Sequence, residues 1–287
     1  MEPSNAQRRL LAIHAHPDDE SITTGGLLAR CADGGVRTRL VTCTDGRYGP
    51  VNPDLGFTLR PDELAKVRRK ELGTAAEMLG VAELDCLGFH DSGMMGSPNN
   101  QWPRAFWAQP LQTLVEQVVR IVRGFRPHVL VTYDPFGCTG HPDHIQAHRA
   151  ALLAVEAATE SHLFPGVGAP WTVSQVFYPV FPMSAMERFI TEEVRAGRPH
   201  PYDGRPSAEI NYVRPDAVVT HQIDISEVYE RKRKALHAHR TQVGSHYPQL
   251  YRAALARREH EHFRLALSRP AEVGVDDIFT SATRGVM

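Results

Sequence analysis

Short apolar runs alternate with longer amphipathic segments over the first 160 residues of the chain. The apolar runs predict strands at Leu10–His14, Arg37–Thr44, Leu84–Leu87 and His128–Tyr133, the last of which is rich in β-branched residues. The segments between them place apolar residues at helical spacing, which predicts helices at Thr23–Asp33, Pro61–Leu79, Leu111–Phe125 and Pro142–Ala158. Strands that alternate with helices of this length form βαβ units, so we expect a layered α/β fold with a mostly parallel sheet flanked by helices.

The pattern is looser after about residue 160, where proline and glycine are frequent. We expect a less regular capping region, together with a last strand–helix unit, over about 161–245. The elements predicted there are a strand at Ser174–Val180, a helix at Met183–Ala196, a strand at Ala217–Ile225 and a helix at Ser226–Arg240 with Ser226 as its N-cap. The whole is expected to be a single domain over 1–270 with its core at 9–160, followed by a weakly ordered tail at 271–287.

The composition is that of an ordinary globular protein, with 42% apolar and 23% charged residues. A formal net charge of -1 excludes the basic footprint expected of a protein that binds nucleic acid or an anionic membrane. No apolar run approaches the roughly 18 residues that a membrane span needs. We therefore expect a cytoplasmic protein that binds a small or neutral ligand, and the sequence leaves a homo-oligomer open. The four cysteines lack C-x-x-C spacing and are expected to be free thiols.

Two histidine motifs follow predicted strands. Residues 14–20 read H-A-H-P-D-D-E, and residues 141–144 read H-P-D-H. Ligands of such sheets bind beyond the carboxyl ends of the strands, where both motifs lie. A catalytic zinc site takes three histidine or carboxylate ligands and leaves one position open. We assign His16, Asp19 and His144 as the ligands, since the first two are three residues apart and can share one side of a helical turn.

Other residues of the two motifs are then left for the chemistry. Asp18 lies next to a ligand and is free to act as the general base on the attacking water. His141 can hold a proton for the leaving amine or stabilise a tetrahedral oxyanion, and Asp143 can fix the tautomer of one of these imidazoles. His14 lies inside the predicted strand, so we interpret it as a hydrogen-bonded wall of the site.

The motif A-H-P-D-D-E after an apolar strand, together with the distant H-P-D-H, resembles the LmbE-like (PIG-L) deacetylase family. The similarity extends over about residues 9–245 through V-T-C-T at 41–44, R-R-K-E-L at 68–72, D-S-G-M at 91–94, F-R-P-H-V at 125–129, T-Y-D-P at 132–135, P-W-T-V at 170–173 and H-R-T-Q at 239–242. These segments look closest to the mycothiol branch, which contains the N-acetylglucosaminyl-inositol deacetylase and the mycothiol S-conjugate amidase.

The resemblance implies a Rossmann-like fold and a zinc-dependent hydrolase that cleaves an N-acyl amide, most often N-acetyl, of a glucosamine-containing small molecule. Ferrous iron in place of zinc stays open. The implied roles are zinc ligation by His16, Asp19 and His144, general base catalysis by Asp18, transition-state stabilisation by His141 with Asp143 as its partner, and substrate binding by Arg68 and Asp91.

One position departs from the family pattern. The branch often has a mobile tyrosine two residues before the first histidine of H-P-D-H, and this chain has Thr139 there. A threonine hydroxyl is too short to reach as a phenol would, so oxyanion stabilisation from that loop and the match to one substrate are both open. Cys138 beside it is expected to be a bystander, with weak ligation or oxidation as the alternative.

Some polar residues fall on the apolar faces of predicted helices. Arg68 and Glu71 do so on Pro61–Leu79, which indicates either a polar cavity or an internal ion pair between them. His239 falls on the inner side of the last predicted helix, where a hydrogen-bonded core histidine is favoured over a site-lining one. The basic run Arg231–Lys234 predicts a solvated face. Trp102, Phe106 and Trp107 are expected to pack a long loop, with an apolar rim over the site as the alternative.

Other functions also fit parts of this pattern. Within amide hydrolysis, a mycothiol S-conjugate amidase and a deacetylase of natural-product amino sugars stay open. Two histidines and one carboxylate also form the facial triad of Fe(II) oxygenases, but βα alternation disfavours that class and leaves Asp18 without a role. A non-catalytic ligand-binding module is disfavoured by the complete set of ligands and base.

Overall fold

The computed structural model describes residues 8–244 and 249–269, and the expected tail at 271–287 lies outside them. The strands are β1 Arg9–His14, β2 Arg37–Thr44, β3 Glu83–Phe89, β4 Val129–Val131, β5 Gln175–Pro182, β6 Val213–Arg214, β7 His221–Asp224 and β8 His260–Ser268. The helices are α1 Asp19–Thr23, α2 Gly25–Asp33, α3 Pro61–Leu79, α4 Leu111–Phe125, α5 Gly137–Gly140, α6 Pro142–Ala157, α7 Met183–Arg195, α8 Tyr229–Ala238 and α9 Gln249–Ala256. Short 3-10 turns lie between some of these elements.

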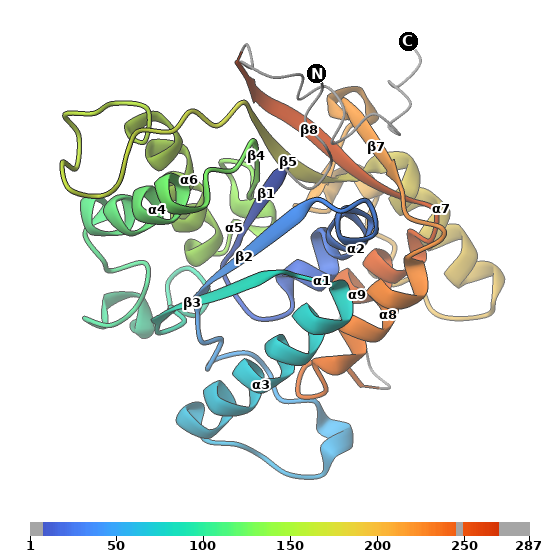
Figure 1. The fold of residues 1–287 in the computed structure, drawn as a ribbon. Helices are drawn as coiled ribbons and strands as arrows, with labels where there is room; N and C mark the ends of the chain where they lie inside the picture. Colours follow the sequence, from blue (N-terminus) through green and yellow to red (C-terminus); the bar gives the residue numbers. More distant parts are fainter. Residues whose placement is uncertain (1–7, 245–248, 270–287) are drawn as a thin grey trace.

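The strands form one sheet in the order β3-β2-β1-β4-β5-β8-β7, with β6 paired to β5 (Figure 1). The pairs from β3 to β5 are parallel, while β8 is antiparallel to both β5 and β7. The prediction of an α/β fold with a mostly parallel sheet is therefore confirmed. The stretch 161–245, expected as a cap, supplies β5 and β7 to this same sheet.

Helices cover both faces of the sheet. Side chains alternate along each strand, so each strand presents apolar residues to the helices on both sides. On β1, Leu11 and Ile13 pack against α4 and α6, whereas Leu10 and Ala12 face α2, α3 and α8 (Figure 1). All four of these β1 side chains are buried. A strand buried on both faces reads as a continuous apolar run, which is the pattern that marked this strand in the sequence.

The strand order reverses between β1 and β4, which are neighbours in the sheet but far apart in the chain. The connection after β1 leads toward α2 on one face, and the connection after β4 leads to α6 on the other. Connections that diverge in this way leave a crevice at the carboxyl ends of the two strands. Both histidine motifs lie at this crevice.

Most predicted elements are present, but several need correction, including the strand expected at His128–Tyr133, which is limited to Val129–Val131. The helix expected to start at Ser226 starts at Tyr229, because the Ser226 side chain and backbone N–H both bind Asp224 instead of capping the helix. The strand expected at Ala217–Ile225 is limited to β7 by a 3-10 turn at Asp216–Val218. Helix α9 and strand β8 had no counterpart in the sequence analysis. The basic run on α8 is not fully solvated, since Lys232 is completely buried.

The four cysteines are free thiols, as predicted. Among the described residues, no helix combines the length and apolar character that crossing a membrane requires.

Candidate metal centre

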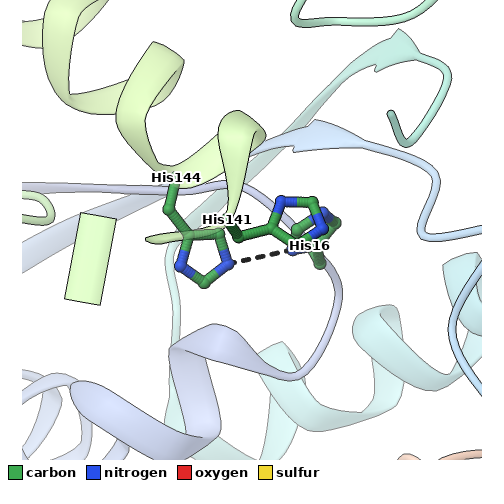
Figure 2. A group of neighbouring side chains, drawn as sticks. All are labelled: His16, His141 and His144. Carbon is green, nitrogen blue, oxygen red and sulfur yellow. Dashed lines mark hydrogen bonds between the residues drawn. The ribbon is translucent and has the colours of Figure 1, made fainter. Parts of the chain in front are cut away.

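Three donor atoms converge at the crevice between β1 and β4. His16 lies in the turn after β1, Asp19 is the first residue of α1, and His144 lies in the first turn of α6. His16 Nδ1 is 3.1 Å from His144 Nε2, the contact drawn as a dashed line in Figure 2. Asp19 Oδ2 is 3.4 Å from each of these nitrogens. The structure therefore brings together the three residues that the sequence suggested as ligands.

The spacing of these donors fits a tetrahedral metal ion. Zn²⁺ binds histidine nitrogen and carboxylate oxygen at about 2.0–2.2 Å, so two ligand atoms on a tetrahedron lie about 3.3–3.5 Å apart. The three measured separations of 3.1–3.4 Å are close to this edge. The group can accept a divalent ion with little movement.

The second nitrogen of His16 faces carboxylates. His16 Nε2 is 3.2 Å from Asp143 Oδ2 and 3.6 Å from Asp91 Oδ1. Burial alone would lower the pKa of His16, but Asp91 and Asp143 hold it well above its ordinary value. Metal-bound histidines usually donate their other N–H to such a partner, which fixes the ring and its tautomer. Asp143 is itself held by the backbone N–H and the hydroxyl of Ser92.

His141 stands at the rim of the donor group, and Figure 2 shows its ring beside those of His16 and His144. Donor atoms of these three histidines lie within 4.8 Å of one another, as do those of His16, Asp91, His141 and Asp143. The set with Asp19 is tighter, and it stays the candidate ligand set.

His141 is the N-cap of α6, where its Nδ1 accepts the backbone N–H of Asp143 at 3.1 Å. Burial, reinforced by His16 and His144, lowers the pKa of His141 to about 2. A neutral ring whose Nδ1 accepts carries its proton on Nε2. This geometry favours donation to an oxyanion over storage of an extra proton. Asp143 Oδ2 is nearer to His16 than to His141 Nδ1, which is 3.9 Å away.

Tyr133, which sequence reasoning missed, supports two of the ligands. Its hydroxyl donates to Asp19 Oδ2 at 2.6 Å and accepts the backbone N–H of Ala15 at 2.8 Å. Its ring stacks on His144, with centroids 4.2 Å apart and planes 17° apart. The sequence signals for it were its place at the end of a predicted strand and within the family-like segment T-Y-D-P, and neither indicated this role.

Asp18 adopts an unusual backbone conformation between the two ligands His16 and Asp19. Its φ of 106° lies where residues other than glycine are rarely found, and such strain is common at functional sites. Asp18 Oδ2 accepts from Arg68 Nη2 at 3.0 Å and from the Tyr251 hydroxyl. Burial raises the pKa of Asp18, and the Arg68 guanidinium opposes that rise.

Arg68 lies behind Asp18 and is only 3% exposed. Its guanidinium donates to the carbonyl oxygens of Gly46 and Pro17 as well as to Asp18. The ion pair considered between Arg68 and Glu71 is wrong, because Glu71 accepts the backbone N–H and the hydroxyl of Thr241.

Asp91 lies beside the candidate ligand His16, with 3.6 Å between Asp91 Oδ1 and His16 Nε2. Its Oδ1 accepts the Gly93 N–H at 2.8 Å and faces the His16 ring, while its Oδ2 accepts the Tyr48 N–H at 3.2 Å. Substrate contacts of Arg68 and Asp91 stay predictions.

The remaining polar residues near the site have structural partners. His14 is buried and bonds to the Thr24 hydroxyl at 2.9 Å. His239 is buried and bonds to Glu20 Oε1 at 2.8 Å, so it is the hydrogen-bonded core histidine that we favoured. Glu20 Oε2 in turn accepts the backbone N–H of Asp18. Glu20, the last residue of H-P-D-D-E, therefore holds the backbone of the strained residue Asp18 in place.

The loop before His141 carries both residues singled out there. Cys138 has a φ of 61°, and burial raises the pKa of its thiol to about 12, which keeps it protonated. The Thr139 carbonyl accepts the Asn211 side-chain amide at 3.0 Å. Of the three aromatic residues considered as a rim, Phe106 is part of the core, whereas Trp102 is 47% exposed.

Comparisons with known proteins agree with this geometry. Residues 11–155 match the family described as PIG-L: GlcNAc-PI de-N-acetylase. A 1D-myo-inositol 2-acetamido-2-deoxy-alpha-D-glucopyranoside deacetylase of Catenulispora acidiphila is 43% identical over 246 residues, which is 83% of this chain and 76% of the relative. A deacetylase of the same name from Rhodococcus jostii is 39% identical over 286 residues, which is 94% of this chain and 96% of the relative.

Solved structures share the fold at lower identity. The N,N'-diacetylchitobiose deacetylase of Pyrococcus horikoshii has a TM-score of 0.63 and 22% identity over 90% of this chain and 83% of its own. GalB, a 4-carboxy-2-hydroxymuconate hydratase of Pseudomonas putida, has a TM-score of 0.60 and 19% identity over 93% of this chain and 99% of its own. The fold thus carries more than one reaction, and membership rests on the sequence matches. Since these matches span both histidine motifs, the chain belongs to the PIG-L family of de-N-acetylases, which confirms the hydrolase predicted from those motifs.

Proposed function

We propose that this chain hydrolyses the N-acetyl amide of a glucosamine-containing small molecule, with N-acetylglucosaminyl-inositol as its substrate. The observation that carries the proposal is the triangle of His16, Asp19 and His144 donors, spaced for one tetrahedral ion. The two relatives described above, which are named as deacetylases of this compound, support the choice of substrate. We propose Zn²⁺ as the ion, with Fe²⁺ as the alternative, because histidine nitrogen and carboxylate oxygen are donors that both ions accept.

A Zn²⁺ ion held by these donors would polarise the amide carbonyl and lower the pKa of the attacking water. Asp18 takes a proton from that water as its oxygen attacks the carbonyl carbon. The neutral His141 donates a hydrogen bond from its Nε2–H to the carbonyl oxygen as negative charge develops there. Asp18 then returns the proton to the leaving nitrogen while the C–N bond breaks, which gives acetate and a free amine.

The fixed tautomers of the two histidines suit these roles. Asp143 and Asp91 orient His16 so that Nδ1 faces the other ligands. The Asp143 backbone N–H orients His141 so that its proton is on Nε2. An oxygenase would use neither a spare carboxylate nor a neutral donor of this kind, and we therefore prefer hydrolysis.

The test is amine release, detected with fluorescamine, by the metal-loaded protein. The substrates are N-acetylglucosaminyl-inositol, a mycothiol S-conjugate and N-acetylglucosaminyl-malate. We expect turnover of the first, loss of activity on chelation and recovery on addition of Zn²⁺ or Fe²⁺. Asp18→Asn should lower kcat about 10²–10⁴-fold while metal content is unchanged, because it removes only the base. Preference for the mycothiol conjugate would replace the proposed substrate, and no amine release from any of the three would refute the proposal.

A further inference from the structure

Tyr251 reaches the site from a part of the chain that the family match does not cover. The match ends at residue 155, whereas Tyr251 lies in α9. Its hydroxyl donates to Asp18 Oδ2, the same oxygen that Arg68 Nη2 binds at 3.0 Å. No sequence motif pointed to this residue, and nothing in the proposed reaction uses it so far.

Two donors on one oxygen decide which way the carboxylate faces. A free aspartate exchanges its two oxygens by rotation about its last side-chain bond, which is broad and roughly two-fold. With Oδ2 bound by a guanidinium and a phenol, that exchange requires both hydrogen bonds to break. No residue in the described ranges donates to Oδ1. Oδ1 is thereby left to accept the proton of the attacking water.

The helix that carries the phenol packs against α1, the helix that begins at the proposed ligand Asp19. Ala253 and Ala254 of α9 are buried in one apolar cluster with Ile22 of α1, and α1 begins at Asp19. The Tyr229 hydroxyl of α8 donates to the Leu255 carbonyl of α9 at 2.9 Å. Burial and the neighbouring Asp18 carboxylate raise the pKa of Tyr251 well above its ordinary value, so the phenol stays a donor.

We propose that Tyr251 is a positioning residue that, together with Arg68, fixes the Asp18 carboxylate so that only Oδ1 is presented to the attacking water. This inference rests on the proposed function, because it assigns Asp18 the role of base. Removal of the hydroxyl would leave the base in place but held by Arg68 alone, so that its carboxylate rotates more easily. The loss should therefore fall on turnover and not on substrate or metal binding.

The first arm of the test is Tyr251→Phe, assayed by amine release from N-acetylglucosaminyl-inositol. We expect kcat to fall about ten- to a hundred-fold, the range for one hydrogen bond to a charged group. KM should stay within about two-fold and Zn²⁺ affinity should be unchanged. The matched control is Tyr229→Phe, which removes a phenol bond to the same helix at Leu255 and should keep the wild-type kcat.

The second arm is a double-mutant cycle with Asp18→Asn. If Tyr251 acts through Asp18, adding Tyr251→Phe to Asp18→Asn should change the residual rate by less than about two-fold. If the two substitutions instead lower the rate by factors that multiply, Tyr251 acts independently of Asp18 and the inference is overturned. An unchanged kcat in Tyr251→Phe, or an effect on KM alone, would also overturn it. An equal loss in Tyr229→Phe would also overturn it, since that result indicates a role in holding α9. A wild-type protein inactive on every substrate would instead refute the proposed function, and the inference with it.

Discussion

The two nitrogens of His16 face different partners, and this separates the role of Asp143 from that of His141. Nδ1 points at Asp19 and His144, while Nε2 points at Asp143. We predict that Asp143→Ala weakens Zn²⁺ binding about 10–100-fold, because the His16 ring loses the partner that orients it. Competition with a chromophoric chelator measures this change.

His141→Ala is the matched variant for that measurement. It should leave Zn²⁺ affinity within a few-fold of wild type and lower kcat about 10²–10³-fold, because it removes an oxyanion donor and no ligand. The opposite pattern, with Asp143→Ala affecting kcat alone, would mean that Asp143 serves His141. That is the pairing implied by family resemblance, and the distances of 3.2 Å to His16 and 3.9 Å to His141 argue against it.

At this scale, the sequence could predict the residues whose partners are close in the chain or share a strand end. His16 and Asp19 are three residues apart, and His144 follows the neighbouring strand. Tyr133 and Tyr251 could not be found in this way. Each acts through one hydroxyl on an aspartate more than a hundred residues away, a contact that only the folded chain creates.

Among the elements, α2 is capped by a side chain from β8. Glu261 accepts the backbone N–H groups of Gly26 and Leu27 in the first turn of α2, at 2.9 and 2.8 Å. It also accepts from Lys232 Nζ of α8 at 2.7 Å, and both charged side chains are fully buried. One carboxylate thus links a strand and two helices.

We predict that Glu261→Gln lowers the free energy of unfolding by about 3–5 kcal/mol, because it leaves the Lys232 ammonium buried without a counter-charge. Urea denaturation measures the loss. Adding Lys232→Met to that variant should recover part of the stability, since the unpaired charge is then gone. The prediction is wrong if the double variant is less stable than Glu261→Gln alone. In that case, losing the packing of the lysine side chain costs more stability than removing its unpaired charge restores.

Elements with chemically marked ends were predicted most closely. The helix expected at Pro61–Leu79 is α3 residue for residue, because a first-turn proline starts it and Gly80, with a φ of 73°, ends it. Strand β8 was missed because its first three residues, His260, Glu261 and His262, are all polar. His262 is buried among neighbouring charges, an environment that only the tertiary fold supplies.

For the whole molecule, the arrangement of strands beyond β5 was not accessible from the sequence. The βα alternation predicts the parallel half, because each crossover must return to the same sheet with one hand. It says nothing about β8, which inserts antiparallel between β5 and β7 although it follows both in the chain. That insertion places the buried His262 and Glu261 on a strand with a neighbour on each side.

This burial predicts how the stability of the molecule depends on pH. Burial, reinforced by Arg257, lowers the pKa of His262 to about 3, below the value of about 6.5 expected in the unfolded chain. Between these values the unfolded state binds a proton that the folded state excludes, so stability is full above pH 6.5 and falls as the pH drops. The slope for one such histidine is at most about 1.4 kcal/mol per pH unit, which gives on the order of 1–2 kcal/mol by pH 5.

The measurement is urea denaturation of the metal-free protein in chelator at pH 7 and pH 5, since bound metal would add a pH dependence of its own. His262→Gln should lose less stability than wild type over this interval, because glutamine takes up no proton. The matched control is His162→Gln, whose side chain is 74% exposed in the native protein and which should keep the wild-type pH dependence. If His262→Gln and wild type lose equal stability on acidification, the folded protein protonates His262 without cost, and β8 is then more accessible to water than its burial indicates.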